Sequence, residues 1–227
     1  MVPINTTHRN SGHTRLLGAL AAPDSSTRLQ AALAAGTHPA PDLVDALLQR
    51  CAVEPDFFVR DMLTWALTRL PAQTTLPKLR AELTSECAQA RSQALHTLSK
   101  IGHRAVWPAV TRSLLRDPDD EVARSAWRAA VVLAPEEEKG ALAAELATQL
   151  GRGDREVQLS LSRAFVALGE PAEPVLDAAA VAHNPAVRAH ANATQRLLRD
   201  PDAGFDLAVD AARRVVALGP DGEEAAC

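Results

Sequence analysis

The stretch DFFVRDMLTWALTRLP at residues 56–71 contains the pattern that decides the fold. Asp56 is followed three and four positions later by Val59 and Arg60, and apolar residues then recur every three or four positions. This spacing places the apolar side chains on one face of an α-helix. Asp56 stands where an N-cap residue accepts hydrogen bonds from free backbone N–H groups, and Pro71 marks the end. We therefore predict a helix that buries one stripe.

The same pattern recurs along the chain, and its arginine positions are about 30 to 35 residues apart. A second apolar run lies between successive copies, for example at residues 41–52, 105–115 and 138–150. Two helices per copy, each pair burying its face on the next, indicate a stacked helical repeat. The residues at the arginine position of the six copies are Arg28, Arg60, Arg91, Ala123, Gln158 and Arg188.

The composition supports an all-α fold. Hydrophobic residues make up 47% of the 227 residues, which is enough to form a core. They are mostly Ala, Leu and Val, whereas Tyr is absent and aromatic residues total 3%. Small apolar side chains let helices approach closely, and the β-branched and aromatic runs typical of strands are missing.

Charge and cysteine content restrict the class of partner. The net charge of −4 gives no basic excess, which argues against binding to a nucleic-acid backbone. The three cysteines, Cys51, Cys87 and Cys227, are widely spaced, as expected for reduced thiols in a cytoplasmic protein. No segment reaches the roughly 20 consecutive apolar residues that a membrane-spanning helix requires.

The series Asp-x-x-Val-Arg-x-x-Ala, from about residue 14 to 199, resembles the HEAT-repeat family in its short bacterial form. The segment RSQALHTLSKIG at residues 91–102 is also similar to HEAT modules found alone or fused to MerR-type regulators. The resemblance implies a right-handed α-α superhelix of about six helix pairs. It also implies binding of a partner along a curved surface, without implying one particular activity.

The predicted organisation is one solenoid with distinct ends. Residues 1–12 are expected to form a flexible tail, and residues 13–219 a single HEAT-repeat solenoid. Within it, GFDLAVDAARRVVALG at 204–219 is predicted to be a capping helix. Residues 220–227 are predicted to be an acidic, mobile C-terminal segment.

The resemblance places the second helix of each pair on the concave side. Positions two, five, six and nine after the apolar anchor then point away from the buried stripe. Tryptophan supplies apolar contact area and arginine pairs with carboxylate or phosphate, so such a surface suits a protein partner. The candidate binding residues are Asp61, Trp65, His96, Arg124, Trp127, Arg128, Arg163 and Arg196. The alternative is that these positions are only solvated, with Trp65 and Trp127 half-buried between layers.

The consensus arginines Arg28, Arg60, Arg91 and Arg188 each follow an Asp, Asn or Cys by four residues. One interpretation is an anion-binding row. The resemblance favours another, in which Asp–Arg contacts join adjacent repeats, and we expect this second arrangement.

The sequence predicts a noncatalytic protein-binding, scaffold or regulatory adaptor module with no cofactor and no metal. Catalytic elbows, Walker loops and dinucleotide fingerprints are absent, and no histidine or cysteine spacing is typical of a metal site. One alternative is a HEAT-like DNA glycosylase or other groove enzyme, in which Asp61, Trp65, Trp127 and Arg128 would take the catalytic roles. Another is a small-molecule-binding regulator. The sequence does not specify an oligomeric state.

Overall fold

The computed structural model describes residues 5–200, with side chains from residue 12. The predicted capping helix at 204–219 and the acidic segment at 220–227 lie outside the described residues. The chain divides into two compact units, of which unit 1 ends at Ala109 and unit 2 begins at Val110.

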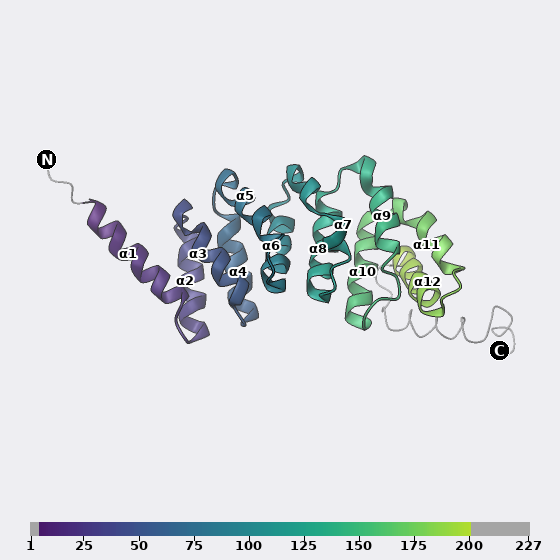
Figure 1. Cartoon of the computed structure of the whole chain (residues 1–227), viewed down its shortest axis with the longest axis horizontal. Helices are drawn as coiled ribbons and strands as arrows, with labels where there is room; N and C mark the ends of the chain where they lie inside the picture. Colours follow the sequence, from purple (N-terminus) through teal and green to yellow (C-terminus); the bar gives the residue numbers. More distant parts are fainter. Residues whose placement is uncertain (1–4, 201–227) are drawn as a thin grey trace. The chain divides into compact units, whose positions relative to one another are not determined.

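Unit 1 contains three helix pairs, α1 with α2, α3 with α4, and α5 with α6 (Figure 1). The second helices of these pairs form a row, since α4 packs against both α2 and α6. Helix α1 starts within the segment that we predict to be a flexible tail. The elements are α1 (Asn5–Leu20), α2 (Ser25–Thr37), η1 (Pro41–Leu43), α3 (Val44–Val53), α4 (Phe57–Thr68), α5 (Ala72–Glu82), α6 (Ala88–Ile101) and η2 (Arg104–Ala109).

Unit 2 repeats this arrangement with the pairs α7 with α8, α9 with α10, and α11 with α12. Its second helices also form a row, because α10 packs against both α8 and α12. The elements are α7 (Arg112–Leu115), α8 (Asp120–Leu133), η3 (Glu136–Glu138), α9 (Lys139–Ala147), α10 (Arg155–Leu168), η4 (Glu170–Ala172), α11 (Glu173–Ala180) and α12 (Pro185–Arg199).

The predicted all-α fold of sequential helix pairs is confirmed for residues 5–200, which contain six pairs. The right-handed superhelix and the single continuous solenoid stay predictions. The predicted apolar stripe is also confirmed. Val59, Leu63 and Leu67 of α4 are buried, as are their counterparts Val122 and Ala126 of α8.

The predicted N-caps are present at five of the six second helices. In each, one side-chain oxygen accepts hydrogen bonds from backbone N–H groups of the first helical turn, which have no partner within the helix. The sixth helix, α6, begins after Cys87, whose side chain makes no such bond. The capping residues are Asp24, Asp56, Asp119, Asp154 and Asn184.

The consensus arginines bind the turn that precedes their own helix. Each Nη1 donates to the carbonyl oxygens five and six residues earlier, at 2.7–3.1 Å, as when Arg60 binds Glu54 and Pro55. These bonds lie within one repeat, because each turn exposes two carbonyls beneath the guanidinium. The expected Asp–Arg contacts between adjacent repeats stay a prediction. The arginines are Arg28, Arg60, Arg91 and Arg188.

Arg28 also reaches the next repeat, where its partner is Glu54 rather than an aspartate. Its Nε and Nη2 donate to the two carboxylate oxygens at 2.7 and 2.8 Å, and Arg50 Nε donates to Oε2 at 2.7 Å. The backbone N–H of Asp56 adds a fourth hydrogen bond at 2.9 Å. Burial alone raises the pKa of Glu54, but the hydrogen bonds from Arg28, Asp56 and Arg50 outweigh it and lower the pKa to about 2.

One of the two repeats that lack the consensus arginine obtains a guanidinium from its neighbour. Ala123 occupies the arginine position of α8 and is completely buried. Arg152, from the turn before α10, donates Nη2 to the carbonyl of Asp117 at 2.5 Å and Nε to Asp120 Oδ1 at 2.9 Å. Asp117 is six residues before Ala123, so its carbonyl corresponds to one of the two that a consensus arginine binds. Here a guanidinium from the following repeat binds it instead.

We predict that Arg152→Ala lowers the free energy of unfolding by about 1–3 kcal/mol, because it leaves the carbonyl of Asp117 without its donor. Adding Ala123→Arg to that variant should restore most of the loss, since it returns the arginine to its consensus place. In the wild type, Ala123→Arg should be destabilising, because Arg152 already occupies the site. Chemical denaturation of the four proteins measures these differences. Equal destabilisation by Ala123→Arg in both backgrounds contradicts this explanation.

Candidate binding surfaces

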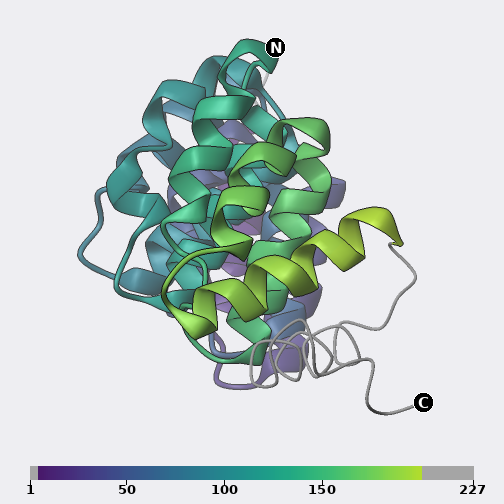
Figure 2. The ribbon, with the colours of Figure 1, turned by 90° about the vertical axis from the view of Figure 1, so that its right-hand side faces the viewer.

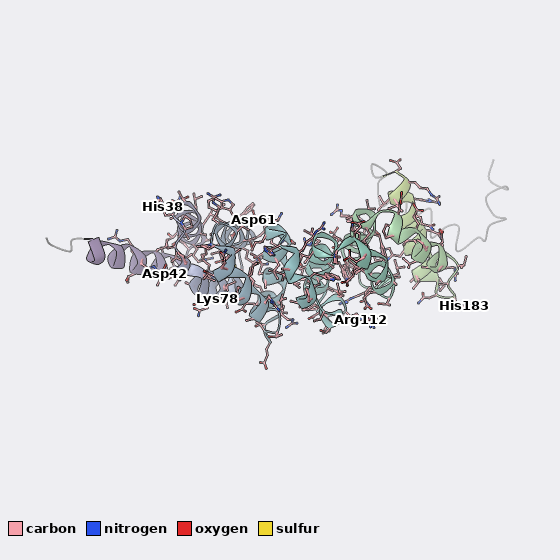
Figure 3. The ribbon with its side chains drawn as sticks, turned by 90° about the horizontal axis from the view of Figure 1, so that it is seen from above. His38, Asp42, Asp61, Lys78, Arg112 and His183 are labelled. Atoms are coloured by element: carbon pink, nitrogen blue, oxygen red, sulfur yellow. The ribbon has the colours of Figure 1, made fainter. Side chains whose placement is uncertain are left out.

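The row of second helices in unit 1 presents Trp65 and Asp61 of α4 at the surface. Figure 3 places Asp61 and His38 along one edge of unit 1 and Lys78 of α5 along the opposite edge. Lys78 is paired with Asp45 of α3, so that edge belongs to the first helices. His96 lies on the neighbouring helix α6 and is partly buried. The prediction that Trp65 and Asp61 are accessible is therefore consistent with the structure.

Trp65 is held in place by a glycine of the preceding repeat. A Cβ atom added to Gly36 of α2 would lie 2.1 Å from Cζ3 and 2.4 Å from Cε3 of the indole. The ring thus occupies the space that a side chain at this position would take. Its exposed fraction is 37%, so part of the indole packs between layers and the rest faces solvent.

Two further apolar side chains lie on these helices and were missed by the sequence analysis. Leu33 of α2 has an exposed fraction of 47%, and Phe58 of α4 one of 71%. Leu33 is one turn from Gly36, so it lies on the side of α2 that contacts the indole. Phe58 is seven residues before Trp65, so the two side chains lie on the same side of α4. We call Leu33, Phe58 and Trp65 the apolar face of unit 1. Leu33 occupies the same position in the first copy of the repeat as Trp65 does in the second. Its exposure could therefore have been predicted from the sequence.

In unit 2 the corresponding row exposes guanidinium groups. Arg128 of α8 and Arg163 of α10 are both exposed, and Arg124 lies one turn before Arg128. Arg128 Nη2 donates to Ser125 Oγ at 3.0 Å, and Arg124 Nη1 pairs with Glu121 at 2.7 Å. Protein atoms exclude part of the water around Arg128; this, with the positive charge of Arg124, lowers its pKa below the usual value. We call Arg124, Arg128 and Arg163 the basic face of unit 2.

Trp127 is wrong as a binding residue. Its side chain is completely buried, and Nε1 donates to the carbonyl oxygen of Leu115 in α7 at 2.9 Å. A buried indole needs a partner for its N–H group, and the end of the short helix α7 supplies one. Trp127 therefore joins the two helices of its pair and contributes to the core.

Helix α12 departs from the regular row and runs obliquely relative to α10 (Figure 2). Its Ala193, together with Ala189 and Leu197, forms a small apolar cluster against which Leu159 and Val166 of α10 pack. Ala193 occupies the position in the repeat that Arg128 has in α8 and Arg163 has in α10. This position is exposed in those two helices but buried in α12. Arg196, the candidate on this helix, is partly buried.

A buried polar network fixes α12 to α10. The backbone N–H of Gly151 donates to His190 Nδ1 at 3.0 Å, so the ring proton lies on Nε2, within 3.0 Å of the carbonyl of Gln158 and of Ser162 Oγ. Ser162 and Thr194 share a hydrogen bond of 2.7 Å, and Thr194 donates to the carbonyl of His190. Burial lowers the pKa of His190 to about 4, against a smaller opposing effect of the Gln158 carbonyl.

The described residues contain no group of three or more His, Cys, Asp or Glu side chains placed to hold a metal ion. Of the cysteines in that range, Cys51 is buried and Cys87 is exposed, and neither is in a disulfide. Burial raises the pKa of the Cys51 thiol to about 12. That thiol is therefore neutral at physiological pH and unsuited to act as a nucleophile or ligand. The expected absence of metal and cofactor stays a prediction.

These features were compared with known proteins. Residues 59–131 match the HEAT-repeat family. The matched HEAT segment runs from α4 to α8. A comparison with curated proteins finds no match. Among solved structures, the chain is similar to an engineered protein, Northeast Structural Genomics Consortium target OR329, with 20% identity and a TM-score of 0.44. The alignment covers 87% of this chain and 96% of that one.

Between residues 5 and 200, no helix is both long enough and apolar enough to cross a membrane. The predicted cytoplasmic location stays a prediction.

We predict that Gly36→Ala lowers the free energy of unfolding by about 1–3 kcal/mol, because the new methyl group overlaps the indole of Trp65. In a Trp65→Ala background the same change should be neutral or stabilising, since alanine favours helix over glycine. Gly18→Ala in α1 is the matched control, because its Cβ would meet nothing within 4 Å. Thermal denaturation checks all four variants. If Gly36→Ala lowers the free energy of unfolding equally with and without Trp65, the proposed contact between Gly36 and the indole is wrong.

The His190 network predicts a pH dependence of stability. The folded pKa of about 4 lies below the ordinary value of 6.5, so the unfolded chain takes up the proton first as the pH falls. The contribution of neutral His190 to the free energy of unfolding should be fully present above pH 6.5. It should be lost as the pH falls from 6.5 to 4, by about 3 kcal/mol in total. The difference between wild type and His190→Gln, measured by denaturation across this range, isolates the effect. His183→Gln, at an exposed position (Figure 3), should retain the wild-type dependence.

Proposed function

We propose that the chain is a noncatalytic protein-binding module, and that the apolar face of unit 1 contacts an apolar segment of the partner. The observation that carries this proposal is the exposure of three large apolar side chains, Leu33, Phe58 and Trp65, on the adjoining helices α2 and α4. Exposed apolar groups gain free energy when a partner removes them from water.

The arrangement of the apolar face favours a protein partner. Tryptophan and other large side chains in the centre of an interface contribute most of its binding energy. Trp65 is already positioned by Gly36 of the preceding repeat, so little conformational entropy is lost when a partner packs on it. Phe57 lies beside Phe58, with ring centroids 5.6 Å apart, and extends the apolar area at the start of α4.

The alternative of a groove enzyme receives less support. It requires Trp127 among its aromatic residues, and that side chain is buried in the helix pair. The small-molecule regulator and the MerR-linked adaptor role remain compatible with a binding module, and both would use the same helices. DNA binding that collapses as salt is added would revive the glycosylase alternative.

The experiment uses peptides selected from a random display library against the full chain. We expect selected apolar peptides to lose about 30-fold or more in affinity with Trp65→Ala or Phe58→Ser, as for central contacts of an interface. Val181→Ser, which changes an exposed apolar residue of unit 2, is the matched control and should retain affinity. Fluorescence anisotropy measures the binding. Affinity that is lost equally with Val181→Ser, or kept by both unit 1 variants, removes the apolar face from the proposal.

A further inference from the structure

The basic face of unit 2 contains two arginines, Arg128 and Arg163, that form no ion pair within the described part of the unit. Most arginines of unit 2 are engaged elsewhere. Arg112 and Arg116 of α7 both pair with Glu145, and Arg152 pairs with Asp120. By contrast, no carboxylate among residues 12–200 forms an ion pair with Arg128 or Arg163.

The guanidinium groups of Arg128 and Arg163 lie on one side of adjacent helices. Arg128 and Arg163 each follow a buried valine, Val122 and Val157, by six residues, and α8 packs directly against α10. Because both arginines are the same number of residues after a buried valine, their side chains lie on the same side of the row of helices. Packed helices are about 8–10 Å apart, and this sets the spacing between the two cations.

The position of Arg124 is a second reason to expect that an anion binds near Arg128 and Arg163. It lies one helical turn from Arg128, so two like charges are neighbours on α8. Its Nε is buried and has no hydrogen-bond partner within the described chain, although Nη1 is bound to Glu121. A negatively charged group between Arg128 and Arg163 relieves this repulsion.

The surrounding charge favours a short acidic segment over a nucleic acid. Residues 110–200 hold more carboxylates than basic side chains, so the basic face is a local feature of an acidic unit. A duplex carries one phosphate charge per roughly 1.7 Å along its axis, and the excess of carboxylates in residues 110–200 opposes its approach. In a polyproline II segment, which has three residues per turn, two carboxylates three residues apart lie on one face about 9 Å apart, and this matches the separation of the helices.

We propose that Arg128 and Arg163 form a carboxylate-binding pair that receives an acidic segment of a protein partner, with the two acidic residues three positions apart. Arg128 and Arg163 each donate N–H groups to one carboxylate, a geometry to which the planar guanidinium is suited. This inference rests on the proposed protein-binding function and adds a chemical class of partner to it. It involves another unit than the apolar face, so each can fail without the other.

The test is an NMR titration of the full chain, observing the Nε–Hε signals of arginine. The probe is a ten-residue Gly/Ser peptide with two glutamates three positions apart, and the control peptide carries glutamine at both places. Signals assigned to Arg128 and Arg163 through Arg128→Gln and Arg163→Gln should shift and saturate with the glutamate peptide only. Each variant should weaken binding by about three- to fivefold at low salt, as for exposed ion pairs.

Three outcomes overturn the proposal. One is an absence of shifts. Another is equal shifts at Arg69, an exposed arginine of unit 1 that serves as the control. The third is a response to a short DNA duplex without a response to the glutamate peptide, which would assign the basic face to phosphate. Phe58→Ser should leave the titration unchanged. A titration lost in that variant would show that the two faces are not separate sites.

Discussion

The turn before each second helix is the constraint on which the described structure depends. A helix start leaves backbone N–H groups without partners, and the turn that leads into it leaves carbonyls exposed. Before α2, α4 and α12 an Asp or Asn oxygen takes these N–H groups, while the guanidinium four residues later takes the carbonyls five and six residues before it. Both ends of the turn are thus closed by side chains only four residues apart. The apolar stripe that follows is then presented to its neighbours at a fixed angle, and this allows pairs to stack.

Each unit adds one buried polar centre to this scheme. In unit 1, Glu54 collects Arg28 from α2, Arg50 from α3 and the backbone that starts α4. In unit 2, His190 joins α12 to the Gly151 turn and to α10. Buried polar groups are costly unless every hydrogen bond is made, and at each centre the partners come from more than one element. These centres therefore fix how neighbouring helix pairs meet more specifically than apolar contact does.

Local rules were enough to predict the repeat, the caps and the buried stripe from the sequence. Each depends on residues within one helical turn or on a period of the helix. The division between surface and core was harder. Trp65 and Trp127 occupy offsets that differ by one, and only the position of α7 decides that the second is buried. Ala193 is buried in the apolar cluster between α12 and α10, and the segment 105–115 is split between the 3-10 helix η2, which contains Pro108, and the single turn of α7. These outcomes depend on packing between elements, which no periodicity encodes.

The arginine that closes the turn before α8 comes from the neighbouring repeat, and this limits how the gene segments can be rearranged. Repeat arrays are often treated as interchangeable blocks, in which one copy can be deleted or duplicated without harm to the others. Removing the block that carries Arg152 would strip the preceding copy of its donor, because Ala123 offers none. Ala123 and Arg152 are thus expected to be inherited together, and recombination between them would be selected against.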